Sequence, residues 1–542
     1  MAMKRMTTKG FRLRGVLFDF DGTLTCPGAL DFAEIRSAIG CPPGQSILAY
    51  IDTIPHADKP RVADLLDQYE MTGAERSIPN PDVESILHYL KSCKLFVGII
   101  SRNGIRPVQR ALKNFPALGA DDFHIIITRD DDIQPKPSGA GIRFAAERFG
   151  VRAEELLVVG DYLYDMEAGN QAGAVTALLH HPDTTLSFQA ESDFVITSLQ
   201  DVQEIVRLGL PLPAGKLPND ILAGFLKKLD LADPSVVIPP AIGEDIAAVT
   251  VETKSVLVLK SDPITFVTSE MGYYAVLVNA NDVVTSGAKP RWFLSSLLFP
   301  VGTTSSGVLA VMEELQTACD QWEIALCGGH TEITNAVCQP VVVGMMAGTV
   351  APDCLIDKRN IRKGDLVLLT KRIAVEGTAI LAGAMGEKLQ QMGIAADQVT
   401  AALNLKQNIS IIKEAEIASG HPGVSGLHDV TEGGVATAVS ELSVAGGHTI
   451  CIELEKIPCY PETTAICDAL GLEPFGLIGS GSLLIACRKE AAHELMGKMA
   501  AVGIEINCIG EVRGPGRGVK ALLDGREVEW PDFQADEITR AL

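Results

Sequence analysis

The sequence predicts an α/β domain built on a parallel sheet, followed by a two-part module of α+β type. Upstream of residue 210, short β-branched and apolar runs alternate with helical patterns, which indicates βαβ units. Residues 211–217 are rich in proline and glycine, as expected of a linker. Beyond them glycine content rises and longer strands are expected. With 542 residues in the chain, we expect domains at 1–210, 218–352 and 353–542.

In the first domain, the predicted strands cover residues 16–18, 96–100, 125–127, 156–159 and 175–178. Residues 26–88 form too long a stretch for an ordinary connection between a strand and a helix, so we expect a small helical cap there. The ligands of parallel sheets bind beyond the carboxyl ends of the strands. Candidate functional residues are therefore sought at those ends.

In the second part, strands are expected at 255–260, 341–348 and 366–370, and helices at 307–322 and 432–445. Proline and glycine interrupt the pattern near 351–363, which favours a boundary between two subdomains there.

Charge and composition restrict the possible partners. The net charge of −22 argues against nucleic acid or an anionic membrane, because both attract proteins rich in Lys and Arg. The 12 cysteines include no C-x-x-C pair, which is typical of free thiols in a reducing compartment. No secretory signal and no apolar run of spanning length is found, so we expect a soluble cytoplasmic protein.

Two aspartates, Asp19 and Asp21, directly follow the first apolar run, and Phe20 separates them. Side chains of a strand alternate between its faces, so both carboxylates are expected on one side. Two unpaired carboxylates are costly to bury unless a cation or a reaction needs them. Alone, such a pair is more often a turn or a helix cap.

Polar residues also follow three further predicted strands: Ser101, Lys136, and the pair Asp161 and Asp165. With these motifs in order, residues 14 to 205 resemble the haloacid dehalogenase superfamily of phosphohydrolases, and the insertion resembles its small cap. The nearby run 130–132 is interpreted as a solvated loop.

The resemblance implies a role for each of these residues. Asp19 attacks phosphorus and forms an aspartyl phosphate, and Asp21 protonates the leaving alcohol and then activates water. Ser101 and Lys136 neutralise the phosphoryl oxygens. Mg²⁺ is expected on carboxylate oxygens, from the set Asp19, Asp21 (through its carbonyl), Asp161 and Asp165.

A second set of candidate residues, acidic, polar and glycine, lies among apolar runs downstream of the linker. Its members are expected to hold a metal-bridged nucleotide: Asp245, Asp262, Asn281, Asp282, Gly328, Gly329, Thr331 and Glu332, with Asp245, Asp262 and Asp282 also as metal ligands.

Residues 218 to 525 resemble the aminoimidazole-ribonucleotide (AIR) synthase superfamily, which includes thiamine-monophosphate kinase, selenophosphate synthetase and the carbamoyl dehydratase of hydrogenase maturation. The motifs that carry this resemblance are Asn281–Asp282, residues 287–290, residues 328–331 and residues 426–436. The resemblance implies ATP, Mg²⁺ and a homodimer that binds ATP across its interface.

The sequence departs from the pattern of this superfamily at three places, and each departure bears on which activity is expected. His330 stands where the kinase and dehydratase relatives carry Asp, so either one metal ligand is missing or Glu332 substitutes for it. The last five residues contain no cysteine, which argues against carbamoyl transfer to a terminal thiol. The absence of cysteine between 214 and 245 argues against selenophosphate synthesis. Two interpretations of Gly433 and Gly434 stay open: a phosphate site at a helix start, or tight packing.

These observations lead to two hypotheses about function. The first is a bifunctional enzyme that hydrolyses a small phosphorylated metabolite in its first half and uses ATP to phosphorylate or activate a small substrate in its second. The alternative is an ATP-binding regulatory or scaffold protein in which only the phosphatase half, or neither half, is catalytic.

Overall fold

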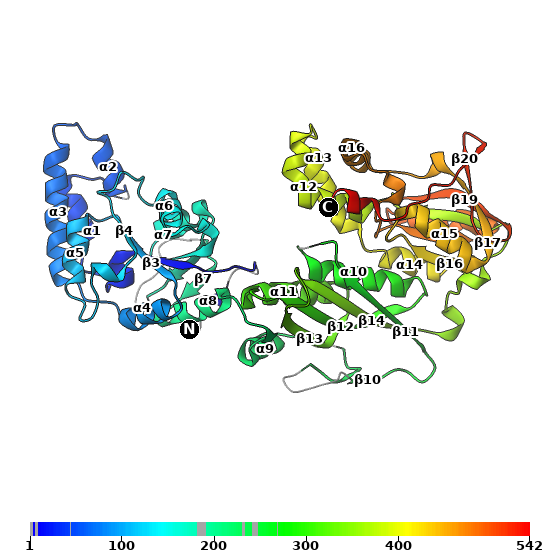
Figure 1. Cartoon of the computed structure of the whole chain (residues 1–542), viewed down its shortest axis with the longest axis horizontal. Helices are drawn as coiled ribbons and strands as arrows, with labels where there is room; N and C mark the ends of the chain where they lie inside the picture. The colour runs from blue at the N-terminus through cyan, green and yellow to red at the C-terminus, as the bar shows by residue number, and fades with distance from the viewer. Residues whose placement is uncertain are drawn as a thin grey trace. The chain divides into compact units, whose positions relative to one another are not determined.

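The computed structural model describes residues 4–5, 9–43, 45–181, 191–229, 233–240, 248–267 and 269–542. The chain divides into two compact units (Figure 1). Unit 1 comprises Met1–Pro213 with Val301–Ala310, and unit 2 comprises Ala214–Pro300 with Val311–Leu542. No helix among the described residues is long and apolar enough to cross a membrane.

Unit 1 is built on a seven-stranded sheet in the order β1-β7-β6-β5-β2-β3-β4, in which only β1 runs antiparallel to its neighbour. The central β2 lies between β3 and β5, so the residues that follow these three strands meet at one edge. The strands are β1 (Lys4–Arg5), β2 (Gly15–Phe18), β3 (Phe96–Ile100), β4 (Ile125–Ile127), β5 (Leu156–Gly160), β6 (Val175–Leu179) and β7 (Phe194–Ile196).

The sheet is covered on both faces, as its all-apolar central strands require. Val16 and Phe18 of β2 belong to one buried core cluster, and Leu17 to the cluster on the opposite face. Helices α4 (Val83–Ser92), α5 (Ile105–Leu112) and α8 (Val202–Gly209) contribute to the first cluster, and α6 (Ala140–Phe149) and α7 (Leu163–Ala172) to the second.

The helical cap is present and consists of α1 (Phe32–Ile39), α2 (Ile47–Thr53) and α3 (Lys59–Arg76). The Asp31 carboxylate accepts hydrogen bonds from the first backbone N–H groups of α1, and Gly40 ends this helix in the left-handed conformation. The last part of the predicted range 26–88 is not cap. It begins α4, whose Ile86 and Leu87 are fully buried in the core under the sheet.

Unit 2 begins with a five-stranded mixed sheet in the order β11-β14-β12-β13-β8. Helix α10 (Met271–Val284) packs on this sheet. The other helices of this region are α9 (Asn219–Leu226) and the part of α11 (Ser305–Gln321) that follows Ala310. The strands are β8 (Gly215–Lys216), β11 (Val256–Ile264), β12 (Lys289–Pro300), β13 (Ala325–Thr334) and β14 (Val341–Val350); β9 (Val236–Ile238) and β10 (Ala248–Val249) pair separately.

A second mixed sheet of seven strands follows, in the order β16-β18-β15-β19-β17-β20-β21. Its strands are β15 (Leu366–Thr370), β16 (Val424–Asp429), β17 (His448–Glu453), β18 (Leu483–Cys487), β19 (Ile506–Pro515), β20 (Val519–Leu523) and β21 (Arg526–Val528). Its helices are α12 (Val375–Gln391), α13 (Ala396–Asn404), α14 (Ile412–Ser419), α15 (Gly434–Gly446), α16 (Pro461–Leu470) and α17 (Lys489–Ala501).

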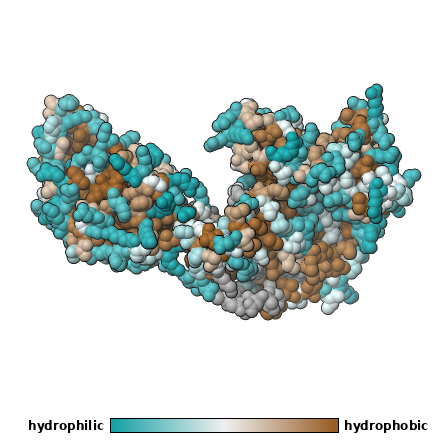
Figure 2. All heavy atoms as spheres, viewed as in Figure 1, coloured by the Kyte–Doolittle hydropathy of each residue, from teal (hydrophilic) through white to brown (hydrophobic). Residues whose placement is uncertain are grey.

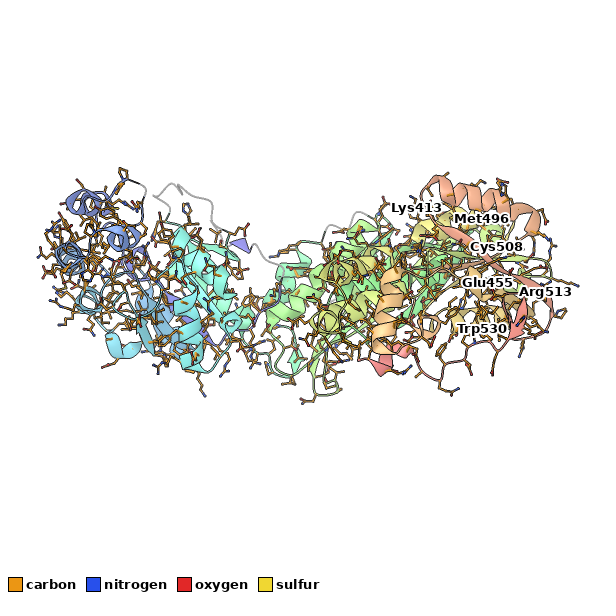
Figure 3. All side chains as sticks on the ribbon, turned by 90° about the horizontal axis from the view of Figure 1, so that it is seen from above. Lys413, Glu455, Met496, Cys508, Arg513 and Trp530 are labelled. Carbon is orange, nitrogen blue, oxygen red and sulfur yellow. The ribbon has the colours of Figure 1, made fainter. Side chains whose placement is uncertain are left out.

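This second sheet has a core on each face. Helix α15 and Trp530 pack on one core, while α14, α17, Met496 and Cys508 pack on the other. Figure 3 shows Met496 and Cys508 on one side of the strands and Trp530 on the other. The two sheets of unit 2 therefore form the two-part α+β module that the sequence predicts.

Candidate functional site

The end of β2 delivers two carboxylates to one cavity. The backbone N–H of Asp19 donates to the Val159 carbonyl of β5 at 2.8 Å, which holds the two strand ends together. Phe20 is buried in the core, while Asp19 and Asp21 both line the cavity. The following Gly22 has φ = 78°, and a Cβ there would lie 2.2 Å from an Asp161 carboxylate oxygen. Only glycine lets the chain turn this close to Asp161.

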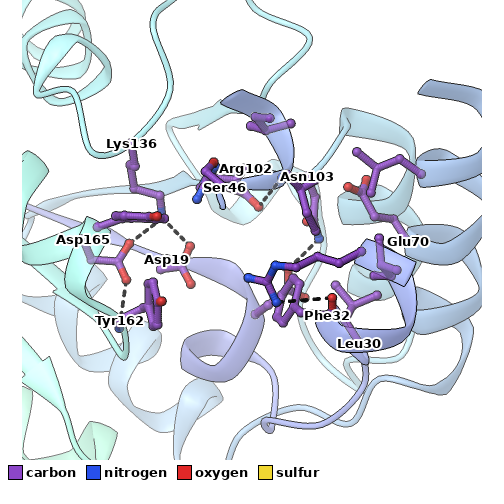
Figure 4. Close-up of a pocket in the computed structure, with 18 of the residues that line it drawn as sticks. Asp19, Leu30, Phe32, Ser46, Glu70, Arg102, Asn103, Lys136, Tyr162 and Asp165 are labelled. Atoms are coloured by element: carbon purple, nitrogen blue, oxygen red, sulfur yellow. Dashed lines mark hydrogen bonds and ion pairs between the residues drawn. The ribbon is translucent and has the colours of Figure 1, made fainter. Parts of the chain in front are cut away.

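Lys136 bridges two of the acids. Its Nζ contacts an Asp19 carboxylate oxygen and lies 2.5 Å from Asp165 Oδ1, and its side chain is 5% exposed. Burial alone would lower the pKa of Lys136, but the charges and hydrogen bonds of Asp165 and Asp19 outweigh it and raise the pKa. Lys136 therefore stays a cation beside Asp19 (Figure 4).

Three carboxylates offer a set of oxygens to a divalent cation. One oxygen from each of Asp19, Asp161 and Asp165 lies within 4.8 Å of the other two. Burial, then repulsion from Asp19 and Asp165, raises the pKa of Asp161 to about 8, and burial raises that of Asp165 to about 6 although Lys136 opposes the shift. A bound cation would relieve this repulsion, so the donor set fits Mg²⁺.

Asp21 is placed apart from this set and holds its proton more firmly than an ordinary aspartate. Burial, followed by the charges of Asp19 and Glu70, raises its pKa to about 7. The Asn103 amide donates to Asp21 Oδ2 at 2.6 Å. The sequence-based reasoning missed Asn103, although its place two residues after Ser101 could have indicated it. Ser101 is buried, lines the cavity and accepts a hydrogen bond from the Asn103 N–H at 3.1 Å.

The cavity has a volume of about 410 Å³, which suits a small molecule. The residues from the ends of β2, β3 and β5 form one wall, and the cap forms the other (Figure 4). The cap wall is mostly apolar, through Leu30, Phe32, Ile35, Ile47, Leu48 and Leu66.

In unit 2, Lys260 joins two of the predicted acids. Its Nζ lies 2.9 Å from Asp262 Oδ2 and 3.1 Å from Asp282 Oδ2. Lys260 stands two residues before Asp262 on β11, so both share one face of the strand. That spacing could have identified Lys260 from the sequence. Asp245 lies outside the described residues.

Groups from the second sheet complete this cluster. Burial and then the charge of Asp429 raise the pKa of Asp282 to about 8. Asp429, at the end of β16, is 4% exposed, and its Oδ2 has no hydrogen-bond partner among the described residues. Lys358 Nζ lies 2.9 Å from His428 Nδ1, and Glu441 lies 3.0 Å from His428 Nε2. His428 and Asp429 lie in the motif 426–436 that carries the resemblance, but no residue beyond position 353 was predicted as a ligand.

Asn281 has a structural role. Its side chain is fully buried, donates to the Ile409 carbonyl at 2.8 Å and accepts from the Ile411 N–H at 3.0 Å. Both ends of the amide are therefore occupied by backbone.

The segment with Gly328, Gly329, Thr331 and Glu332 lies on β13, and His330 beside it is 54% exposed. Strands β14 and β12 separate β13 from β11, so the segment and Asp262 are roughly 14 Å apart across one sheet. A single chain does not bring these residues to the Lys260 cluster.

The structure favours packing at Gly433 and Gly434. A Cβ on Gly434 would lie 2.4 Å from the Phe475 carbonyl oxygen. The Gly433 N–H donates to Asp536 Oδ2 at 2.7 Å, so a carboxylate of the chain itself occupies the start of α15.

Comparisons with known proteins agree with the division of the chain. Residues 16–179 match the family model described as haloacid dehalogenase-like hydrolase. Residues 243–350 and 362–521 match the N-terminal and C-terminal domains of AIR synthase related proteins. An uncharacterized hydrolase of Saccharomyces cerevisiae is 31% identical over 199 residues, which is 36% of this chain and 90% of that protein.

The second half has relatives of another kind. Carbamoyl dehydratase HypE of Cupriavidus necator is 28% identical over 288 residues, or 51% of this chain and 78% of that protein. A putative hydrogenase expression/formation protein of Methanocaldococcus jannaschii is 26% identical over 270 residues, or 49% and 75% of the two chains. The crystal structure of E. coli HypE matches 59% of this chain and all of that chain, with 22% identity and a TM-score of 0.51, which shows a shared fold.

Proposed function

Because the chain belongs to the haloacid dehalogenase-like hydrolases through its first unit and carries both AIR synthase related domains in its second, we propose that it is a bifunctional enzyme. The first unit hydrolyses phosphomonoesters of small metabolites with Mg²⁺. The second uses ATP to phosphorylate or activate a small substrate. One observation carries the first activity: Asp19 lies against Lys136 and beside two further carboxylates at the base of a cavity.

The first unit's residues account for each step of the hydrolysis. An Asp19 oxygen attacks phosphorus, the bond from phosphorus to the ester oxygen breaks, and Asp21 gives its proton to the departing alcohol. Asp21 then takes a proton from water, whose oxygen attacks the phosphorus and releases phosphate from Asp19. The raised pKa of Asp21, about 7, suits a group that alternates between acid and base.

Lys136 and Ser101 hold negative charge that the transferred group carries. Both are buried and fixed before substrate arrives, so little reorganisation is needed during the reaction. Asp161 and Asp165, with Asp19, would hold the Mg²⁺, which supplies further neutralisation of the phosphoryl oxygens when bound. A screen for phosphate release from small phosphomonoesters with Mg²⁺ tests the activity, and turnover of none of them would refute it.

For the second unit, the cluster of Lys260, Asp262, Asp282 and Asp429 supports a site for ATP with a divalent ion. Lysine ammonium groups neutralise phosphate, and buried carboxylates with a free oxygen bind cations. ATP consumption measured with a panel of small substrates tests the activity. Tight ATP binding without turnover on the whole panel would favour the alternative, a nucleotide-responsive regulatory protein.

We also propose a homodimer formed through the first sheet of unit 2. Leu257, Leu259 and Met345 of β11 and β14 are 44%, 57% and 41% exposed, and Figure 2 shows apolar side chains gathered over this sheet. An apolar patch of this kind is typical of an interface. A second copy would also supply the β13 segment that a single chain holds away from the Lys260 cluster. Leu259→Glu should shift the mass in light scattering from dimer to monomer, and a dimer that withstands it would contradict this interface.

A further inference from the structure

Two arginines line the cavity of unit 1 in addition to Lys136. Arg36 belongs to helix α1 of the cap, and Arg102 follows β3 directly after Ser101. Both arginines donate hydrogen bonds to uncharged oxygens. Arg36 donates to the Gln45 and Phe32 carbonyls at 3.3 Å, and Arg102 Nη2 donates to the Ser46 hydroxyl at 2.6 Å.

Neither arginine has a carboxylate partner among the described residues of the chain. The neighbouring Arg129, by contrast, forms an ion pair with Glu70. Arg102 Nε is buried without a hydrogen-bond partner, and its guanidinium lies 4.7 Å from the centre of the Tyr164 ring. Burial lowers the pKa of Arg102, although Tyr164, Asp165 and Asp19 oppose the shift. Such a cation is costly unless an anion joins it.

The position of these arginines relative to the reacting groups limits what that anion can be. Lys136 and Ser101 already neutralise the group that Asp19 attacks. Arg102 bonds the cap through Ser46 and so connects the core wall with the cap wall, while Arg36 lies on the cap wall itself. Guanidinium groups bind carboxylates and phosphates in a bidentate manner. The cavity of about 410 Å³ accommodates a short molecule that is charged at both ends.

We propose that Arg36 and Arg102 bind a second anionic group of the substrate, which is therefore a short phosphomonoester with a carboxylate or a second phosphate at its far end. The inference rests on the proposed phosphatase activity and adds the class of substrate to it. The apolar cap residues Leu30, Phe32 and Ile35 then face the carbon chain between the two charged groups.

Three compounds of equal length test the proposal: three-carbon phosphomonoesters that end in a hydroxyl, a carboxylate or a second phosphate. With the full-length protein and Mg²⁺, at least one of the two anionic compounds should have a kcat/KM about 10- to 100-fold above that of the hydroxyl compound, mainly through KM. The compound with the larger gain distinguishes a carboxylate from a phosphate.

Substitutions of the two arginines test whether they cause the preference for anionic substrates. Arg36→Gln and Arg102→Gln should each bring the ratio of anionic to hydroxyl substrate toward one, and Arg102→Lys should retain part of it. Arg106→Gln is the matched control, because Arg106 is 73% exposed and outside the cavity, and it should keep the wild-type ratio. Circular dichroism checks that each variant is folded.

Three outcomes separate the hypotheses. Wild-type protein that hydrolyses all three compounds equally overturns the proposal and leaves the phosphatase activity standing. Equal losses on all three compounds in Arg102→Gln also overturn it, because Arg102 would then hold the transferred phosphoryl group. If the wild type hydrolyses none of them and no aryl phosphate, the phosphatase activity fails; calorimetry with the Asp19→Asn protein then decides whether the anionic compounds still bind more tightly than the hydroxyl compound.

Discussion

The acidic clusters of the two units differ in how the chain assembles them. In unit 1, the ends of β2, β3 and β5 lie side by side, so Asp19, Ser101 and Asp161 meet at one edge of a parallel sheet. In unit 2, the sheets are mixed, and the cluster takes Lys260 and Asp282 from the first sheet region and Asp429 from the second. A parallel sheet brings the carboxyl ends of all its strands to one edge, whereas a mixed sheet divides them between two edges.

The clusters also differ in how their charge is compensated. Lys136 touches two of the acids in unit 1. In unit 2, Lys260 pairs with Asp262 and Asp282, while Asp429 keeps an oxygen without a partner among the described residues. Unit 1 therefore presents a nearly assembled site, and unit 2 leaves charge for a ligand or a second copy to satisfy.

The largest expected effect is on the nucleophile of unit 1. Asp19→Asn keeps the volume of the side chain but removes the attacking oxygen, so kcat for phosphate release should fall by at least about 10³-fold. The control is Asp132→Asn in the exposed loop after β4, which should leave kcat unchanged. An Asp19→Asn protein with wild-type activity would refute the assigned nucleophile.

A smaller effect is expected when the metal set loses one ligand. Asp161→Asn removes one charge from the three carboxylates, so the Mg²⁺ concentration for half-maximal activity should rise about 10- to 100-fold. Titration of EDTA-treated protein with Mg²⁺ measures it. An unchanged midpoint would remove Asp161 from the metal set.

A buried carboxyl group of unit 2, that of Glu376, should make the free energy of unfolding depend on pH. Glu376 is buried, with Oε2 unpartnered among the described residues; burial, with further contributions from Glu432 and Asp536, raises its pKa from 4.5 to about 7. The folded state therefore keeps a proton that the unfolded state loses above about pH 4.5, so stability falls as pH rises toward 7 and levels off beyond.

Replacing this carboxyl with an amide should remove that loss. Glu376→Gln should gain on the order of 2 kcal/mol over the wild type on going from about pH 5 to about pH 8. Urea unfolding at both pH values measures the difference. Parallel pH dependence in the two proteins would show that Glu376 titrates normally.

The smallest expected effect concerns the nucleotide. Asp282→Asn removes a carboxylate that Lys260 and Asp429 surround, so ATP affinity in the presence of Mg²⁺ should fall about tenfold. Calorimetry measures the affinity, and Asp524→Asn, on a surface turn of the second sheet region, serves as the control. Equal ATP affinity in the wild type, Asp282→Asn and Asp524→Asn would show that the nucleotide does not bind at Asp282.

The sequence predicted unit 1 well because its strands are short, apolar and each followed by a polar residue that the parallel sheet must gather. The structure brings the predicted Asp19, Lys136 and Asp165 to one cavity, but the sequence reasoning did not name Glu70, which the cap contributes, or Asn103, whose amide donates to Asp21. In unit 2 it found Asp262 and Asp282.

Two kinds of information were missing for the rest of unit 2. Asn281 carries a residue type suited to binding, yet tertiary packing occupies its amide with backbone of residues 409 and 411. Lys358 and Asp429 come to the Lys260 cluster from the other subdomain, and no spacing within the sequence predicts a contact between subdomains. The sequence pattern shows which polar residues follow a strand, but which of them come into contact depends on the order of the strands in the folded sheet.

The central claim is that Asp19 carries the phosphoryl group during turnover. The Asp21→Asn protein should accumulate this intermediate with an aryl phosphate, because that leaving group needs no proton while the release of phosphate from Asp19 still needs a base. Acid quenching followed by peptide mass spectrometry should find the phosphoryl group on Asp19. Steady turnover with no phosphoryl group on the peptide, or with that group on another residue, would contradict the account.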